Sequence, residues 1–262
     1  FTVVQANLDA LFQNNGMEFT LRSLNMGGKN LNWSTNFNIT FSHTKLLEFP
    51  NLAGSTYANT LVIGEPLNIK KVYHYVGINQ QSGTYDFKDV NEDGMLTAVE
   101  DKKTISDLTP DFFGGVQNTL KYKRWQLDFL FQFAKQKNYN GSSYFVMPGT
   151  EGNQMAEAKN SWQKTGDNAT YQIYTSGTNS SASAAYFRYF ESDGAISDAS
   201  YIRLKNISIS YDIPLQDLKC RLFLEGQNLL TFTKYNGADP EFTSLGYLPP
   251  LKVFSAGLQF NF

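Results

Sequence analysis

Apolar and polar residues alternate with a period of two along four segments of the chain. From Asn32 to Ser42, one set of alternate positions holds Trp, Thr, Phe, Ile and Phe, whereas the other set holds only Asn, Ser and Thr. The same alternation recurs over 126–133, 206–213 and 254–262. Successive side chains of a β-strand point to opposite faces, so the pattern predicts strands with one apolar and one polar face.

Weaker alternation marks three further strands, and helical periodicity is nearly absent. The weaker strands are expected at 17–24, 114–122 and 219–227. The best helical candidate is a short stretch around 152–163. The pattern therefore predicts an all-β fold with roughly seven or eight strands of about 9–11 residues each.

The connections between these strands fall into two length classes that alternate along the chain. The short ones are 26–31, 122–124 and 214–218, and the long ones are 45–111, 136–200 and 230–252. Outer-membrane barrels have short turns on the periplasmic side and long loops outside the cell. The chain thus reads as a portion of an antiparallel transmembrane β-barrel, with a periplasmic C-terminus and extracellular long loops. The alternative is a soluble β-sandwich with large insertions, which would bury the apolar faces.

Composition narrows the choice between these two folds. The 262 residues include 21 Phe, 15 Tyr and 3 Trp, and the polar strand faces are Asn, Ser, Thr and Gln with few Lys or Glu. Such faces suit a polar lumen better than a soluble surface, and the aromatic residues suit a membrane-facing band. A net charge of −2 argues against a nucleic-acid binder, and a single cysteine excludes an internal disulfide.

Seven short segments, in order, resemble motifs of the SusC/RagA-type TonB-dependent outer-membrane transporters. They are 15–18 (NGME) with 31–33 (LNW), 89–94 (DVNEDG), 110–115 (PDFFGG), 122–127 (YKRWQL), 200–206 (SYIRLKN) with 211–214 (YDIP), 226–231 (GQNLLT) and 239–241 (DPE). The last eight residues also resemble the C-terminal assembly signal of outer-membrane proteins, carried by Gly257, Phe260 and Phe262. Assembly machinery recognises such a strand by pairing with it.

The resemblance implies that residues 1–262 are the C-terminal portion of a 22-stranded barrel from a Gram-negative outer membrane. The family takes up oligosaccharides or peptides under a SusD-like lipoprotein lid, is energised through TonB and is not enzymatic. A plug domain is not found in this sequence, and seven or eight strands alone would leave open edges in lipid. We therefore expect the remaining barrel and the plug in another chain, the alternative being a non-functional truncation. The alternative function is a secreted, calcium-binding β-sandwich that binds carbohydrate.

An acidic segment matches the twelve-residue calcium-loop pattern D-x-[DN]-x-[DN]-G-x5-E. The expected oxygen ligands for Ca²⁺ are Asp89, Asn91, Asp93, the Met95 carbonyl, Thr97 and Glu100. Asp101 is an alternative last ligand. The flanking helices of an EF-hand are missing, so a structural role in an external loop is expected. The other interpretation is a turn without metal, in which Asp89 and Asn91 accept neighbouring backbone N–H groups.

Two further sets of residues are candidates for contact with a ligand. Tyr171–Phe190 is dense in aromatic residues, and Trp162, Tyr186 and Tyr189 are expected to contact substrate or the lid, although self-packing within the loop is an equal alternative. Polar-face residues expected to line the lumen are Asn36, Asn38, Asp128, Ser208 and Ser210. The carboxylate pair Asp239 and Glu241 lies among turn residues, which argues against glycoside hydrolysis.

Overall fold

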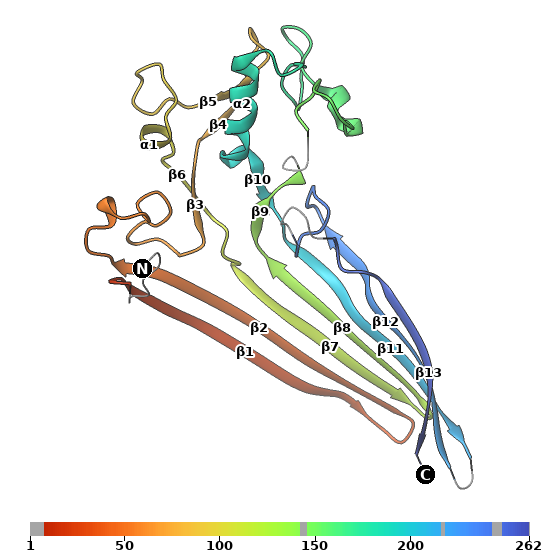
Figure 1. Cartoon of the computed structure of the whole chain (residues 1–262). Helices are drawn as coiled ribbons and strands as arrows, with labels where there is room; N and C mark the ends of the chain where they lie inside the picture. The colour runs from red at the N-terminus through yellow and green to blue at the C-terminus, as the bar shows by residue number, and fades with distance from the viewer. Residues whose placement is uncertain (1–7, 142–145, 216–217, 243–247, 262) are drawn as a thin grey trace, which may run out of the picture.

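A single antiparallel sheet of seven long strands forms the body of the chain (Figure 1). The computed structural model describes residues 8–141, 146–215, 218–242 and 248–261. The strands, in their order across the sheet, are β1 (Leu11–Gly27), β2 (Leu31–Glu48), β7 (Phe112–Tyr122), β8 (Trp125–Lys135), β11 (Tyr201–Pro214), β12 (Lys219–Thr233) and β13 (Val253–Asn261). All seven predicted strands are therefore confirmed. β1 and β13 are the sheet's two edges, so the described strands form an open sheet.

Every strand of the sheet pairs antiparallel with the strand next to it in this order. The three short connections lie at one end of the sheet and the three long ones at the other (Figure 1). β1 and β2 have 17 and 18 residues, longer than the expected 9–11. The alternation fades towards the long loops, where the neighbouring strand still supplies the backbone hydrogen bonds and so extends each strand.

The register puts most apolar positions of the seven strands on one face, with Leu130 and Phe223 among the exceptions. Phe37 pairs with Val116, which pairs with Phe131, and Leu127 pairs with Ile209, which pairs with Leu224. Residues directly opposite in a sheet share a face, so these rows join into one apolar surface.

A glycine keeps this surface closely packed where β2, β7 and β8 meet. A Cβ on Gly114 would lie 2.8 Å from the Phe133 ring, which stacks on Phe37 with ring centroids 6.2 Å apart. The PDFFGG segment therefore supplies a glycine where the neighbouring aromatic ring leaves no room for a side chain.

The first two of the three long loops fold into a separate layer above one end of the sheet, built from short paired strands and helices (Figure 1). The pairs are β3 (Ile69–Val72) with β6 (Thr104–Asp107), β4 (Tyr75–Ile78) with β5 (Tyr85–Phe87), and β9 (Lys137–Tyr139) with β10 (Ile196–Asp198). The helices are η1 (Leu52–Gly54), α1 (Ala98–Asp101), η3 (Ala156–Asn160), α2 (Ser180–Phe190) and η4 (Asp193–Ala195). We call the described residues 49–111, 136–141 and 146–200 together the loop unit.

The helix expected around 152–163 is wrong in position. That segment contains only the short 3-10 helix η3, whereas the longest described helix is α2 at Ser180–Phe190. The side chain of Asn179 caps α2 by accepting from the N–H of Ala182 at 3.1 Å, and alanines follow in the first turns. The many aromatic residues of this region masked the helical pattern of α2, although Asn179 is a favourable N-cap residue.

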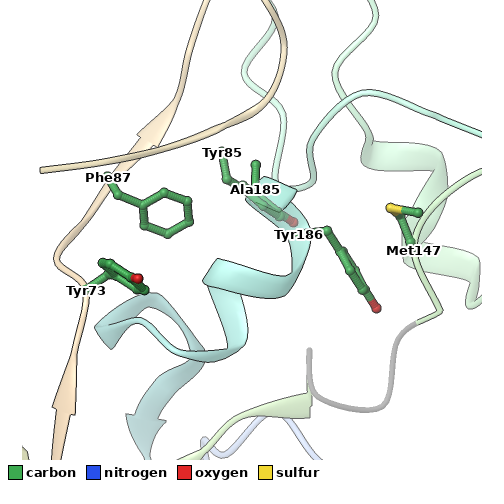
Figure 2. Close-up of a cluster of buried hydrophobic side chains, with 6 residues drawn as sticks. All are labelled: Tyr73, Tyr85, Phe87, Met147, Ala185 and Tyr186. Atoms are coloured by element: carbon green, nitrogen blue, oxygen red, sulfur yellow. The ribbon is translucent and has the colours of Figure 1, made fainter. Parts of the chain in front are cut away.

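A hydrophobic core lies in the loop unit rather than against the sheet. It consists of Tyr73, Tyr85, Phe87, Met147, Ala185 and Tyr186, which converge from both long loops (Figure 2). Backbone hydrogen bonds join the same two loops, from Tyr73 N–H to Glu191 O at 2.9 Å and from Asp193 N–H to Tyr73 O at 3.0 Å. The two long loops therefore fold as one body.

Candidate functional site: the two sheet faces and the loop unit

The polar face of the sheet carries all five residues expected to line a lumen. Asn36 lies opposite Gln117, and Asn38 lies opposite Gly115. Asp128 lies between Thr119 and Ser208, and Ser210 lies opposite Gln126. The register thus brings these side chains to one surface, and their contact with a substrate stays a prediction.

Asp128 is held in place on this face by its neighbours. One carboxylate oxygen accepts from the Thr119 hydroxyl and the other from the Gln126 side-chain amide, each at 2.6 Å. The same row continues through Ser208 to Glu225 and Ser255. It therefore places two carboxylates among hydroxyl groups, an arrangement that suits contact with water or polar solutes.

The apolar face is exposed over most of its area. Phe19 is 54% exposed, Leu224 53% and Leu258 55%, and the strands make their extensive contacts only with adjacent strands. A β-sandwich would cover this face with a second sheet. No such second layer occurs among the described residues, which argues against the sandwich interpretation.

Amphipathic aromatic residues gather on this face at the short-turn end. They are Trp33, Tyr122, Trp125 and Tyr211, and the rings of the last two lie 4.7 Å apart. The 11 residues of β8, at about 3.4 Å each, span roughly 35 Å. If the strand is tilted by about 45° from the membrane normal, its length along that normal is about 25 Å, which matches the height of a barrel's apolar band.

A buried ion cluster on the polar face joins the sheet to the loop after β12. Arg203 on β11 is 1% exposed, and it donates to Asp239 Oδ2 at 2.6 Å and Glu241 Oε2 at 2.8 Å. Its Nε also donates to the Thr231 hydroxyl at 3.1 Å, and Lys205 Nζ lies 3.2 Å from Glu241. Two cations and two carboxylates balance, which is the condition under which buried charges are tolerated.

This ion cluster, Arg203, Lys205, Asp239 and Glu241, explains two of the family-like motifs at once. The SYIRLKN segment supplies both cations and the DPE segment both carboxylates. Asp239 also accepts from the N–H of Glu241 at 2.9 Å, so the turn presents its carboxylate to Arg203. In the sequence alone, these carboxylates have the pattern of a turn or a catalytic pair. The balancing Arg and Lys in the other motif were the available signal.

The acidic loop is closed by its own backbone. Asp89 accepts from the N–H groups of Glu92 and Gly94, each at 2.8 Å, and Asp93 accepts from Met95 N–H at 2.8 Å and from Asn91 Nδ2 at 2.9 Å. Asp89 thus makes the contacts of the turn interpretation, whereas the other expected acceptor, Asn91, donates its side-chain amide to Asp93, and Asp93 accepts a backbone N–H instead. Across the described part of the chain, no group of three or more His, Cys, Asp or Glu side chains is arranged to hold a metal ion. Calcium in this loop stays a prediction.

Asp101, the alternative last ligand, is the residue that ties the two ends of the acidic loop together. It is 1% exposed and accepts from the N–H groups of Val90 at 2.8 Å and Thr97 at 2.7 Å. These backbone donors lower the pKa of its carboxyl group below the usual value. Glu100 is exposed, and its backbone N–H donates to the Thr97 hydroxyl, so Thr97 caps the short helix α1.

The three aromatic residues expected to contact substrate or the lid pack within the loop unit. Tyr186 is 7% exposed in the core (Figure 2), and burial raises the pKa of its hydroxyl to about 12. Trp162 is equally buried, beside Gly83. Tyr189 stacks on Tyr85 with ring centroids 4.5 Å apart. The burial of Trp162 and Tyr186 and the stacking of the partly buried Tyr189 favour the self-packing alternative, and contact with a ligand or lid stays a prediction.

Two of the three assembly-signal residues lie in β13 at the edge of the sheet. Gly257 lies opposite Phe223, and a Cβ there would come within 2.5 Å of that ring, so packing alone explains the glycine. Phe260 is on the apolar face and is 47% exposed. Phe262 lies outside the described residues. Recognition of this strand by assembly machinery stays a prediction.

Comparison with known proteins finds sequence relatives that are named as TonB-dependent receptors. The chain is 28% identical to TonB-dependent receptor P3 of Formosa agariphila over 95% of its length, and 24% identical to TonB-dependent receptor SusC of Bacteroides thetaiotaomicron, also over 95%. It covers only 29% and 26% of those relatives, so it spans less than a third of their length. No family model matches the sequence.

Solved structures agree with the sequence relatives. The RagAB peptide importer in its open-open state matches with a TM-score of 0.76 at 23% identity, covering 97% of this chain and 29% of that one. A second RagAB peptide transporter structure matches with a TM-score of 0.75 at 21% identity, over 96% and 29%. The comparisons confirm the resemblance to SusC/RagA-type TonB-dependent transporters and the fold of a barrel portion. None of the described helices is long and apolar enough to cross a membrane.

Proposed function

We propose that this chain forms part of the wall of an outer-membrane importer, with its apolar face towards lipid and its polar face towards the lumen. The observation that carries the proposal is the exposed apolar face, continuous in register across seven strands. Similarity to proteins named as TonB-dependent receptors, and to structures named as peptide importers, supports the same reading. The relatives are named as receptors and transporters, which is consistent with a protein without catalytic activity.

The proposal includes the parts of the importer that lie beyond this sequence. The open edges β1 and β13 would pair with the remaining strands, because unpaired backbone groups in lipid cost several kcal/mol each. A plug would contact the TonB system, and a SusD-like lipoprotein would cover the extracellular loop unit. The transported solute would be an oligosaccharide or a peptide, and a polar face of Asn, Ser and Asp side chains suits either.

Uptake by whole cells tests this proposal. Cells that produce the full-length protein are given fluorescent oligosaccharides or peptides, and accumulation is compared with cells lacking its gene, with and without a proton uncoupler. We expect gene-dependent uptake of one solute class that the uncoupler abolishes. Uptake that persists in uncoupled cells would argue against TonB energisation. A protein that stays soluble without detergent would overturn the membrane assignment.

Calcium binding by the acidic loop is part of the proposal, as a structural element of the extracellular surface. The oxygen-rich set Asp89, Asn91, Asp93 and Glu100 matches the ligand chemistry of Ca²⁺. Hydrogen exchange of 89–101 in the full-length protein, with Ca²⁺ or with a chelator, measures the effect. We expect Ca²⁺ to increase protection, and Asp93→Ala to remove that increase. Equal protection with Ca²⁺ and with the chelator would overturn calcium binding and support the turn interpretation.

A further inference from the structure

A groove lies on the apolar face, where the sheet meets the long loops. Its volume is about 550 Å³, and its lining includes Phe112, Phe133, Ile202, Phe232, Lys135, Asp198 and Lys234. These residues belong mainly to β7, β8, β11 and β12, the middle of the sheet. The groove is therefore complete within this chain, unlike hollows beside the edge strands.

The floor of the groove continues the apolar face. Phe133 lies opposite Ile202, which lies opposite Phe232, and the Phe112 and Phe133 rings are 6.3 Å apart. Ile202 and Phe232 are half or more exposed, although both are large and apolar. An exposed apolar floor of this kind favours contact with hydrocarbon, such as the acyl chains of a bilayer, over contact with water.

The rim of the groove is positively charged. Lys135 and Lys234 both line it, against the single carboxylate of Asp198, which accepts from Lys135 Nζ at 2.8 Å. All three side chains are exposed to a large degree. Lysine stems cover apolar surface while their ammonium groups reach the polar boundary of a membrane. Among the residues that line the groove, two ammonium groups thus stand against one carboxylate.

We propose that this groove binds a membrane lipid with a phosphate-bearing headgroup, whose acyl chains lie on the Phe133–Ile202–Phe232 floor and whose phosphate lies between Lys135 and Lys234. The inference rests on the proposed function, because it requires the apolar face to contact lipid. Basic pockets next to a membrane's hydrocarbon region attract anionic headgroups in this way. At the short-turn end, the same face carries Trp and Tyr rings. The charged groove therefore distinguishes the long-loop end of the apolar face from the short-turn end.

Lipid binding to the full-length protein in neutral detergent tests the proposal, with native mass spectrometry as the readout. The probes are bisphosphorylated lipid A and the same lipid with its phosphates removed. We expect the phosphorylated form to bind more tightly, and Lys234→Gln to weaken it about fivefold, the size of one lysine contact near a membrane surface. Asp198→Asn should strengthen binding, because it removes the negative charge from the rim.

Lys123→Gln is the matched control, because Lys123 lies at the short-turn end over the Tyr122 ring. It should leave lipid binding unchanged. Equal binding of both lipids, or no change in Lys234→Gln and Asp198→Asn, would overturn the inference while leaving the importer intact. Full competition by free inorganic phosphate would also overturn it, because the floor would then contribute nothing. A protein that is soluble without detergent would instead overturn the proposed function.

Discussion

The sheet and the loop unit use the same kind of aromatic and aliphatic side chains in opposite ways. In the sheet, Phe19 and Leu224 point outward and are more than half exposed, while backbone pairing holds the strands together. In the loop unit, Tyr73, Phe87 and Tyr186 turn inward and form a core (Figure 2). The difference teaches that the surrounding solvent, rather than composition, decides which side of an element is buried.

The ion cluster around Arg203 ties the sheet to the loop after β12, and breaking it should have the largest effect. Arg203→Met would leave Asp239 and Glu241 without their buried partner, at a cost of about 3–5 kcal/mol. Limited proteolysis of 234–242 in the full-length protein would detect the released loop. Arg221→Met is the control, because its ion pair with Asp212 is exposed and should contribute at most about 1 kcal/mol. Equal protease sensitivity in both variants would contradict the prediction.

Tyr186→Ala should break the loop unit and spare the sheet. Removing a buried aromatic ring costs about 3–5 kcal/mol, and here the loss should stay local because none of the core residues belongs to a strand of the seven-stranded sheet. Hydrogen exchange should rise in β4, β5 and α2, with β8 and β11 unchanged. Phe187→Ala, on the same helix but 64% exposed, is the control. Loss of protection throughout β8 would show that the two regions unfold together.

Phe129→Arg should break the proposed membrane contact of the sheet and spare the loop unit. An arginine facing lipid near the middle of a bilayer costs about 2–4 kcal/mol in a barrel. Heat-modifiable migration of the full-length protein on gels measures the folded fraction. Leu130→Arg, the next residue of β8, is the control because its row of Gln117 and Asn206 belongs to the polar face. If Leu130→Arg proved the more damaging of the two, the assignment of faces would be reversed.

The smallest effect should come from the acid sensitivity of Asp101. Its folded-state pKa is lowered by backbone hydrogen bonds from Val90 and Thr97. Its contribution is therefore complete above the unfolded carboxyl pKa of about 3.9. It is lost as the pH falls below that value through the lowered pKa. Hydrogen exchange of 89–101 between neutral and acidic pH should show this loss. Asp101→Asn should remove the pH dependence, and the exposed neighbour variant Glu100→Gln should retain it.

The sequence could predict which strand residues lie on the polar face, but not which aromatic residues of the loops are buried. The alternation over 32–42 and 126–133 was sufficient to place Asn36, Asn38 and Asp128 on one face, because alternate residues of a strand share a face. The burial of Trp162 and Tyr186 was not predictable. An aromatic-rich loop reads the same whether its rings pack on each other or face a ligand. The position of α2 was missed because capping by Asn179 is a weaker signal than the aromatic residues around it.

By itself, the sequence determined the strands, their two unlike faces and the alternation of short and long connections. These follow from a period of two and from turn residues, which are local properties of the chain. Only the tertiary structure decided that Arg203 meets Asp239 and Glu241, that two loops share one core, and that Lys135 and Lys234 border the same groove. Those contacts join residues far apart in sequence, and the order of strands across the sheet sets their distances.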